Sequence, residues 1–204
     1  MTEEQPNAGV QAERARASRR SLVSVARRLF ASQGYAGTSV EAIYAGAGLT
    51  RGALYHHFES KQALFRAVFL AVGDGVLTRL EGTEGTPDDA WERFCFNVQR
   101  FLDMAMEDDY RQVVLIDGPA VLGSDERRRH GRVHGMGMLS RSLSMLVEQG
   151  VIAPQPIAPL AHALHGAIME TALYIATSED AETARREAGA TIDRMLHGLR
   201  SGAV

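Results

Sequence analysis

Apolar residues recur at helical spacing along almost the whole chain, and this periodicity is the feature that most restricts the fold. Their positions i, i+3, i+4 and i+7 first mark one helix face at Leu22, Val25, Ala26, Leu29 and Phe30. Similar faces follow as far as residue 199, whereas no alternation of apolar and polar residues lasts long enough for a strand. The sequence therefore predicts an all-α protein of about nine helices without a sheet.

Turn-forming residues divide the predicted helices into two domains. Residues 1–17 are polar and contain no apolar cluster, so we expect a disordered tail. Residues 18–65 contain three short helices, which Gly34 and a turn at Gly48 separate. Residues 66–204 form the remaining helical domain, in which Gly118-Pro119 is expected to stop a short helix that begins at Tyr110.

The charges are divided between the same two parts of the chain. Residues 1–66 contain nine Lys and Arg against five Asp and Glu, and residues 67–204 contain thirteen against twenty. A basic segment on an acidic body is typical of a modular nucleic-acid-binding protein. Arg14 and Arg16 are candidates for an arm that reaches the DNA. The single cysteine, Cys95, excludes an internal disulfide and favours a reducing, cytoplasmic location.

Residues 38–61 have the properties of a helix-turn-helix. Two short predicted helices flank Gly48, which can adopt the positive φ that a tight turn between helices requires. Thr50 caps the second helix, and Arg51 stands at its N-terminus, where such helices meet base edges. Gly52 keeps that helix slim enough for a major groove about 12 Å wide. Arg51 is our candidate for reading guanine.

This segment resembles the DNA-binding domain of the tetracycline repressor (TetR) family. The matching residues follow the family pattern in order and without gaps: Gly34-Tyr35, Thr38, Ile43, Ala47-Gly48, Gly52, Leu54-Tyr55, His57-Phe58, Lys61 and Leu64. The likeness covers about residues 17–69. It implies that Tyr55 contacts a phosphate, and it supports Thr38, His56 and Lys61 as further DNA contacts, with Thr38 or Ser39 also capping its helix.

The resemblance further implies a homodimer on palindromic double-stranded DNA and a small-molecule effector, with no cofactor. The role that the resemblance implies is that of a repressor, which its ligand releases from the operator. We expect the dimer to form through the last two helices, where apolar faces are broad: Leu160, Leu164, Ile168, Ala172 and Ile175, then Ile192, Met195, Leu196 and Leu199.

Adaptable and aromatic side chains of the second domain are candidates for a ligand pocket between helices. They are Phe94, Phe101, Met104, Ile116, Met136, Met169 and Tyr174. Inward positions hold few charges, with Asp103, Asp117, Arg141 and Glu170 as the expected polar exceptions, so we predict an apolar or aromatic ligand held by one or two hydrogen bonds. No stretch predicts a membrane span, because the most apolar one, residues 160–176, is short and contains His and Glu.

Two other functions were weighed. His130 with His134, and His162 with His165, have the spacing of metal ligands, but no Cys or carboxylate joins them in a recognisable motif, so we predict no metal site. No nucleophile elbow, phosphate loop or carboxylate pair is present, so an enzyme is not predicted. The alternative function is a helical small-molecule- or metal-binding protein whose DNA-binding domain is a relic.

Overall fold

The computed structural model describes residues 7–82, 85–123 and 135–200, and the fold there is all-α. In chain order the elements are α1 (Asn7–Gly37), α2 (Val40–Gly46), α3 (Arg51–His57), α4 (Lys61–Glu81), α5 (Ala90–Met104), the π-helix η1 (Tyr110–Asp117), α7 (Gly135–Glu148), α8 (Ile157–Thr177) and α9 (Ala181–His197). The part described contains no strand, only an isolated bridge between Ile152 and Arg200. The predicted fold class is confirmed. None of the helices described has the length and apolarity needed to cross a bilayer.

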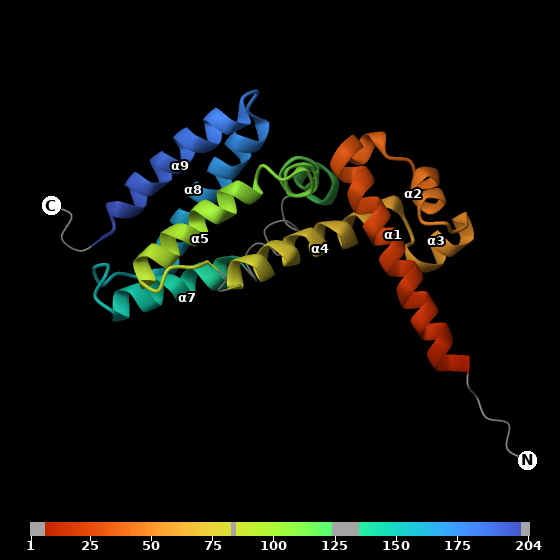
Figure 1. The fold of residues 1–204 in the computed structure, drawn as a ribbon, viewed down its shortest axis with the longest axis horizontal. Helices are drawn as coiled ribbons and strands as arrows, with labels where there is room; N and C mark the ends of the chain where they lie inside the picture. Colours follow the sequence, from red (N-terminus) through yellow and green to blue (C-terminus); the bar gives the residue numbers. More distant parts are fainter. Residues whose placement is uncertain (1–6, 83–84, 124–134, 201–204) are drawn as a thin grey trace, which may run out of the picture.

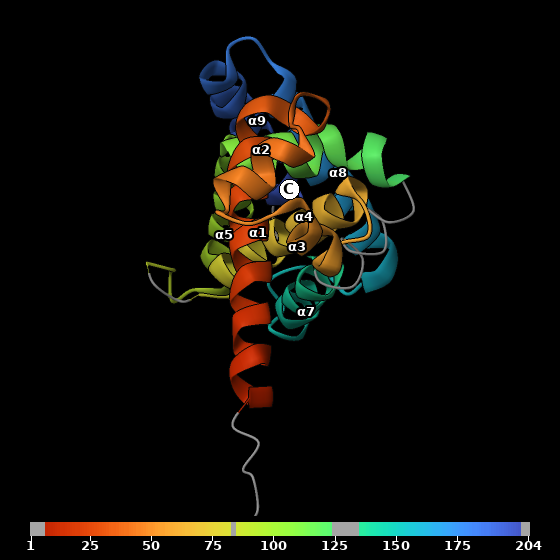
Figure 2. The ribbon, with the colours of Figure 1, turned by 90° about the vertical axis from the view of Figure 1, so that its right-hand side faces the viewer.

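The helices form two groups, and α4 connects them (Figures 1 and 2). The smaller group contains α1, α2 and α3, and α4 runs from it into the larger group of α5, α7, α8 and α9. Segment η1 lies between the groups and packs on α1, α4 and α8. The fully buried side chains of Phe30, Phe65 and Phe69 belong to one continuous core that extends from α1 along α4. The two groups are therefore packed as one molecule.

Helix α1 begins earlier than predicted. It starts at Asn7, so the expectation of a disordered tail is wrong for residues 7–17; residues 1–6 lie outside the part described. Residues 10–17 are mostly Ala, Arg, Gln and Glu, which have high helix propensity. They continue a helix that is already fixed by the burial of Leu22 and Val25, so no new nucleation is needed.

The helix-turn-helix is built by local signals in the sequence. Helix α1 is interrupted at Gly34, whose φ is 68°, and the turn after α2 uses Gly48 at φ 66°. The hydroxyl of Thr50 accepts a hydrogen bond from Ala53 N and caps α3, as predicted. Ser60 caps α4 in the same way. The positions of Gly34, Gly48 and Thr50 agree with the sequence analysis because caps and glycine turns depend on residues only a few positions apart.

The region around Gly118-Pro119 differs from the prediction. The helix does not stop there: η1 leads directly into further helical residues 118–123. In a π-helix the bonds run from i to i+5, so the carbonyl four residues before Pro119 is not held where the proline ring would clash with it. Gly118 is required for packing, because a Cβ atom there would lie 2.9 Å from the ring of Phe69 on α4.

Candidate DNA-binding surface and ligand cavity

One face of α3 is exposed and carries most of the predicted DNA contacts. The side chains of Thr50, Arg51, Tyr55 and His56 are exposed, as is Gly52, while Leu54 on the opposite face is completely buried. The guanidinium of Arg51 lies 5.6 Å from the centre of the Tyr55 ring, which holds both groups on the same side of the helix. This face is slender, polar and unobstructed, as a helix that enters a DNA groove must be.

His57 lies at the border between the exposed face of α3 and the protein interior. It is half-buried, and its ring lies 5.2 Å from that of His56. Burial lowers the pKa of His57 below its ordinary value, and the neighbouring His56 and Arg19 lower it further. Arg19 itself stacks on Phe58 directly after α3. These contacts favour the neutral form of His57.

Thr38 and Lys61 do not lie on the exposed face. Thr38 is 1% exposed, and its hydroxyl donates to the carbonyl of Gly34 at 2.8 Å, while Ser39 caps α2. We therefore correct the assignment of Thr38, because it has almost no surface with which to reach DNA. The ammonium of Lys61 donates to the carbonyl of Tyr35 and lies 4.2 Å from the centre of that ring. Its hydrogen bond is thus made within the protein.

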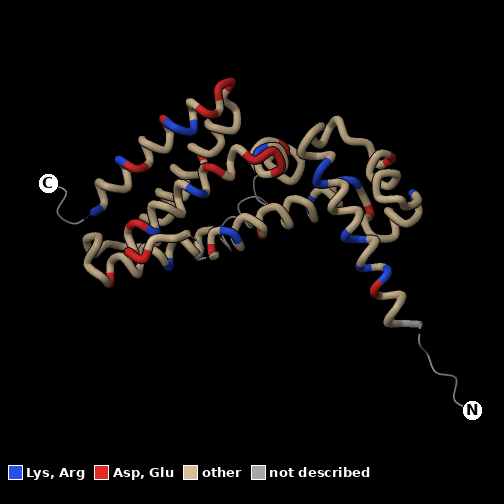
Figure 3. The backbone as a smooth tube through the Cα atoms, in the orientation of Figure 1, with Lys and Arg blue, Asp and Glu red and all other residues tan. Residues whose placement is uncertain are grey.

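Exposed arginines extend the basic character beyond α3. Along α1 they are Arg14, Arg16, Arg19, Arg20, Arg27 and Arg28. In Figure 3 these blue positions follow α1 through the smaller group of helices, whereas red positions are frequent in the larger group. The charge division predicted from the sequence therefore coincides with the division of helices in space.

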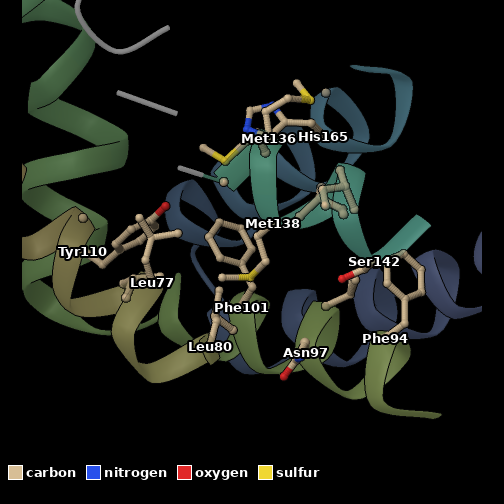
Figure 4. A pocket seen from close by; sticks show the side chains of 18 of the residues that line it. Leu77, Leu80, Phe94, Asn97, Phe101, Tyr110, Met136, Met138, Ser142 and His165 are labelled. Carbon is tan, nitrogen blue, oxygen red and sulfur yellow. The ribbon is translucent and has the colours of Figure 1, made fainter. Parts of the chain in front are cut away.

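A cavity of about 440 Å³ lies inside the larger group of helices, between α4, α5, η1, α7 and α8. Most of its lining is apolar: Phe69, Gly73, Val76, Leu77, Leu80, Phe94, Val98, Phe101, Met136, Met138, Leu139, Ile168 and Met169. Figure 4 shows Tyr110, Phe101 and Phe94 along one side and Met136 with His165 on the other. The volume and lining suit a small, largely apolar molecule.

Of the predicted pocket residues, Phe94, Phe101, Met136 and Met169 line this cavity. Met104, Ile116 and Tyr174 do not, and their assignment is corrected. Met104 is buried in the core, Ile116 is half-buried in η1, and Tyr174 is 55% exposed. Side-chain type does not reveal which helix faces enclose a space.

Polar groups also line the cavity, and most of them were not predicted. Of the four polar residues predicted for the pocket, only Glu170 lines the cavity. The remaining polar residues of the lining are Asn97, Ser142, His162, His165 and Tyr110. Asn97 had a signal in the sequence, because it lies between Phe94 and Val98 on an otherwise apolar helix face. No Lys or Arg belongs to the lining described. His162, Gly166 and Glu170 are exposed, so the cavity reaches the surface beside α8.

The predicted exceptions Asp103, Asp117 and Arg141 have other partners. Asp103 pairs with Arg185, and Arg141 lies 3.8 Å from Glu81. Asp117 accepts a hydrogen bond from the backbone of Tyr35. His130 and His134 lie outside the residues described, and those residues hold no group of three or more His, Cys, Asp or Glu placed to bind a metal.

Comparison with known proteins agrees with both parts of this structure. Residues 22–68 match the family described as bacterial regulatory proteins, tetR family. Residues 91–199 match the family described as tetracyclin repressor-like, C-terminal domain. The N-terminal match covers the helix-turn-helix, and the C-terminal match contains α5 to α9 and much of the cavity.

Individual relatives extend over nearly the whole chain. A TetR-family transcriptional regulator from Pectobacterium atrosepticum is 34% identical, with a TM-score of 0.82 over 93% of this chain and 97% of that one. The transposon Tn10 TetC protein of Escherichia coli is 24% identical over 82% of this chain and 85% of its own length. RolR in complex with resorcinol shares the fold at 19% identity, with a TM-score of 0.67 over 90% and 89% of the two chains. This chain belongs to the tetracycline repressor family and is a DNA-binding transcriptional regulator.

Proposed function

We propose that the protein is a homodimeric repressor that binds palindromic DNA through α3 and is released by a small apolar or aromatic ligand. The observation that carries the proposal is the cavity, because its walls include α4 and η1. Both elements also pack against α1 of the DNA-binding group. A ligand with unequal affinity for two arrangements of these helices would shift the equilibrium between them. The exposed Arg51 on α3, the exposed arginines along α1 and the family match do not favour a relic DNA-binding domain.

The proposed DNA contacts are Thr50, Arg51, Gly52, Tyr55 and His56. We assign base reading to Arg51, because its guanidinium is exposed at the first turn of α3 and can donate two parallel hydrogen bonds to guanine. Tyr55 is exposed one turn later and would reach a phosphate through its hydroxyl. In a dimer, two such helices would occupy successive major grooves about 34–36 Å apart.

The proposed dimer interface lies on the outer faces of α8 and α9. Most of the apolar residues predicted for it, such as Leu164, Ile168 and Ile192, are buried within the protomer. Two large apolar side chains remain exposed, Tyr174 at 55% and Met195 at 49%. Ala163, a small residue of α8, is also exposed and allows a second copy to approach closely. These surfaces support a twofold four-helix bundle.

The ligand class follows from the lining. Aromatic and Met side chains favour a ring or a short apolar chain, and the polar residues on the wall supply one or two hydrogen bonds. The absence of Lys and Arg from the lining described disfavours an anionic ligand. The resorcinol bound by RolR, which shares only the fold, is an example of a small aromatic molecule with hydroxyl groups.

Substitution of Arg51 tests the proposed DNA contact. Bound DNA is selected from a random pool with the full chain, with Arg51→Ala and with the control Arg186→Ala, an exposed arginine of α9. We expect Arg51→Ala to relax base preference at one position of each half-site, with a loss of about 1–3 kcal/mol of discrimination. Arg186→Ala should select the same motif as the unmodified chain. An unchanged motif for Arg51→Ala would contradict the assignment.

A further inference from the structure

Three elements meet at the backbone of Tyr35. This residue follows Gly34, where α1 is interrupted, and its N–H donates to a carboxylate oxygen of Asp117 at 2.7 Å. Its carbonyl accepts a hydrogen bond from the ammonium of Lys61. Lys61 is the first residue of α4, and Asp117 is the last residue of η1. We call this group of three residues the Tyr35 clasp.

The clasp uses strong hydrogen bonds at a position where the backbone needs them. An interrupted helix leaves N–H and C=O groups without partners inside the helix, and here charged side chains from two other elements satisfy them. Lys61 is half-buried, and the aromatic ring of Tyr35 lies against its ammonium. Burial lowers the pKa of Lys61, while the nearby charge of Asp117 acts in the opposite direction.

Further contacts tie the same segment to the DNA-binding group. Asp109, just before η1, pairs with Arg27 of α1. Beyond η1, the side chain of Gln62 donates to the carbonyl of Val121 at 2.6 Å. The segment 109–121 is therefore held to α1 and to the start of α4 at both of its ends. Between these ends, Tyr110 lines the cavity.

We infer that Lys61 and Asp117 are positioning residues, which act through Tyr35 to fix the orientation of the DNA-binding group on the rest of the protomer. In the proposed dimer that orientation sets the separation of the two α3 helices, and hence the half-site spacing that the protein accepts. The inference rests on the proposed homodimer. It also gives Lys61 a role other than the phosphate contact predicted from the sequence.

The test measures spacing preference, which a general loss of stability would not change. Full-length protein is titrated with DNA whose two half-sites are separated by spacers of different length. We expect the unmodified chain to prefer one spacer over its neighbours by about tenfold or more, because the recognition helices are held at a fixed distance. Asp117→Ala and Lys61→Met should reduce that preference to about threefold or less, with the half-site sequence unchanged.

Asp108→Ala is the matched control, because it removes the same charge from an exposed position next to Asp109, where the side chain has no hydrogen bond or ion pair with the residues described. It should keep the preference of the unmodified chain. If Asp117→Ala fails to fold, Asp117→Asn replaces it in the test. Because Asn preserves the size and an acceptor oxygen, this variant should reduce the spacer preference to an intermediate value. The double variant Asp117→Ala/Lys61→Met should be no worse than either single variant, since all of them open one clasp.

A sharp spacer preference in both single variants would overturn this inference and leave the homodimer proposal standing. So would uniform weakening by Lys61→Met with a smaller salt dependence, because that is the signature of a phosphate contact. An unmodified chain that binds single half-sites without a spacer preference would overturn the homodimer proposal together with this inference.

Discussion

At the scale of single residues, Cys95 shows how the environment alters chemistry. Its thiol is half-buried in α5, and burial raises its pKa to about 11, with smaller contributions from the nearby carboxylates and an opposing one from Arg200. Only about one thiol in a thousand would therefore be ionised at pH 8. Since the thiolate is the reactive form, we predict slow modification by an aromatic disulfide reagent in the folded protein and fast modification after denaturation. Prompt reaction of the native protein at pH 8 would contradict this.

Residue-scale predictions from the sequence succeeded where the determining neighbours were close in the chain. The exposure of Arg51 and Tyr55 follows from the cap at Thr50 and from the buried Leu54, all within six positions. Lys61 was placed incompletely because its partner, Tyr35, is distant in the chain. Thr38 bonds the nearby Gly34, but its burial depends on how the chain breaks at Gly34 and packs, which the local sequence does not reveal. The cavity residues depend on five elements at once, so side-chain type alone could not select them.

At the scale of elements, the N-terminal part of α1 is basic, and none of its residues 9–21 is buried. We predict that Arg14 and Arg16 contact phosphates outside the bases read by α3. The double variant Arg14→Ala/Arg16→Ala should reduce the slope of log affinity against log salt by about 1.8, or 0.9 for each lost contact. Gln11→Ala, an exposed neutral position on the same helix, is the control. An unchanged slope would mean that these arginines are only solvated.

Most elements were predictable, apart from the early start of α1 and the continuation of the chain through Gly118-Pro119. Helices α3, α4 and α9 begin directly after their N-cap residues Thr50, Ser60 and Asp180. Such starts can be predicted because the capping hydrogen bond joins residues only three positions apart. The continuation of the chain through Gly118-Pro119 was missed because it depends on η1 and on the ring of Phe69, which is distant in sequence. Glycine and proline therefore mark helix ends reliably only where tertiary packing does not itself require them, as the contact with Phe69 requires Gly118.

At the scale of the whole molecule, assembly can be tested on the exposed faces of α8 and α9. We expect light scattering at micromolar concentration to report a dimer. Tyr174→Glu should shift it towards monomer and weaken operator binding, because a charge would be buried in an apolar contact. Met145→Glu changes a comparably exposed apolar residue of α7 and should leave the dimer intact. A monomeric unmodified chain would refute the proposed interface.

The cavity is tested by filling it. Met169→Trp adds a bulky ring to the cavity wall and should blunt the response to ligands found by screening small phenolic compounds, resorcinol among them, while operator affinity stays nearly unchanged. The same substitution at Met145, which does not line the cavity, should preserve the response. Loss of DNA binding by Met169→Trp with a normal ligand response would instead place Met169 in the structural core.

The π-helical bonding of η1 determines how the two ends of this segment face each other. A turn with i→i+5 bonds accommodates one more residue than an α-helical turn. If the same eight residues formed α-helical bonds, in which each residue turns the helix by about 100°, Asp117 would lie further around the helix axis from Tyr110. Asp117 could then no longer face Tyr35 while Tyr110 kept its place in the cavity. The wider π-helical turn therefore decides which way Asp117 points, whatever the identity of the residues between it and Tyr110.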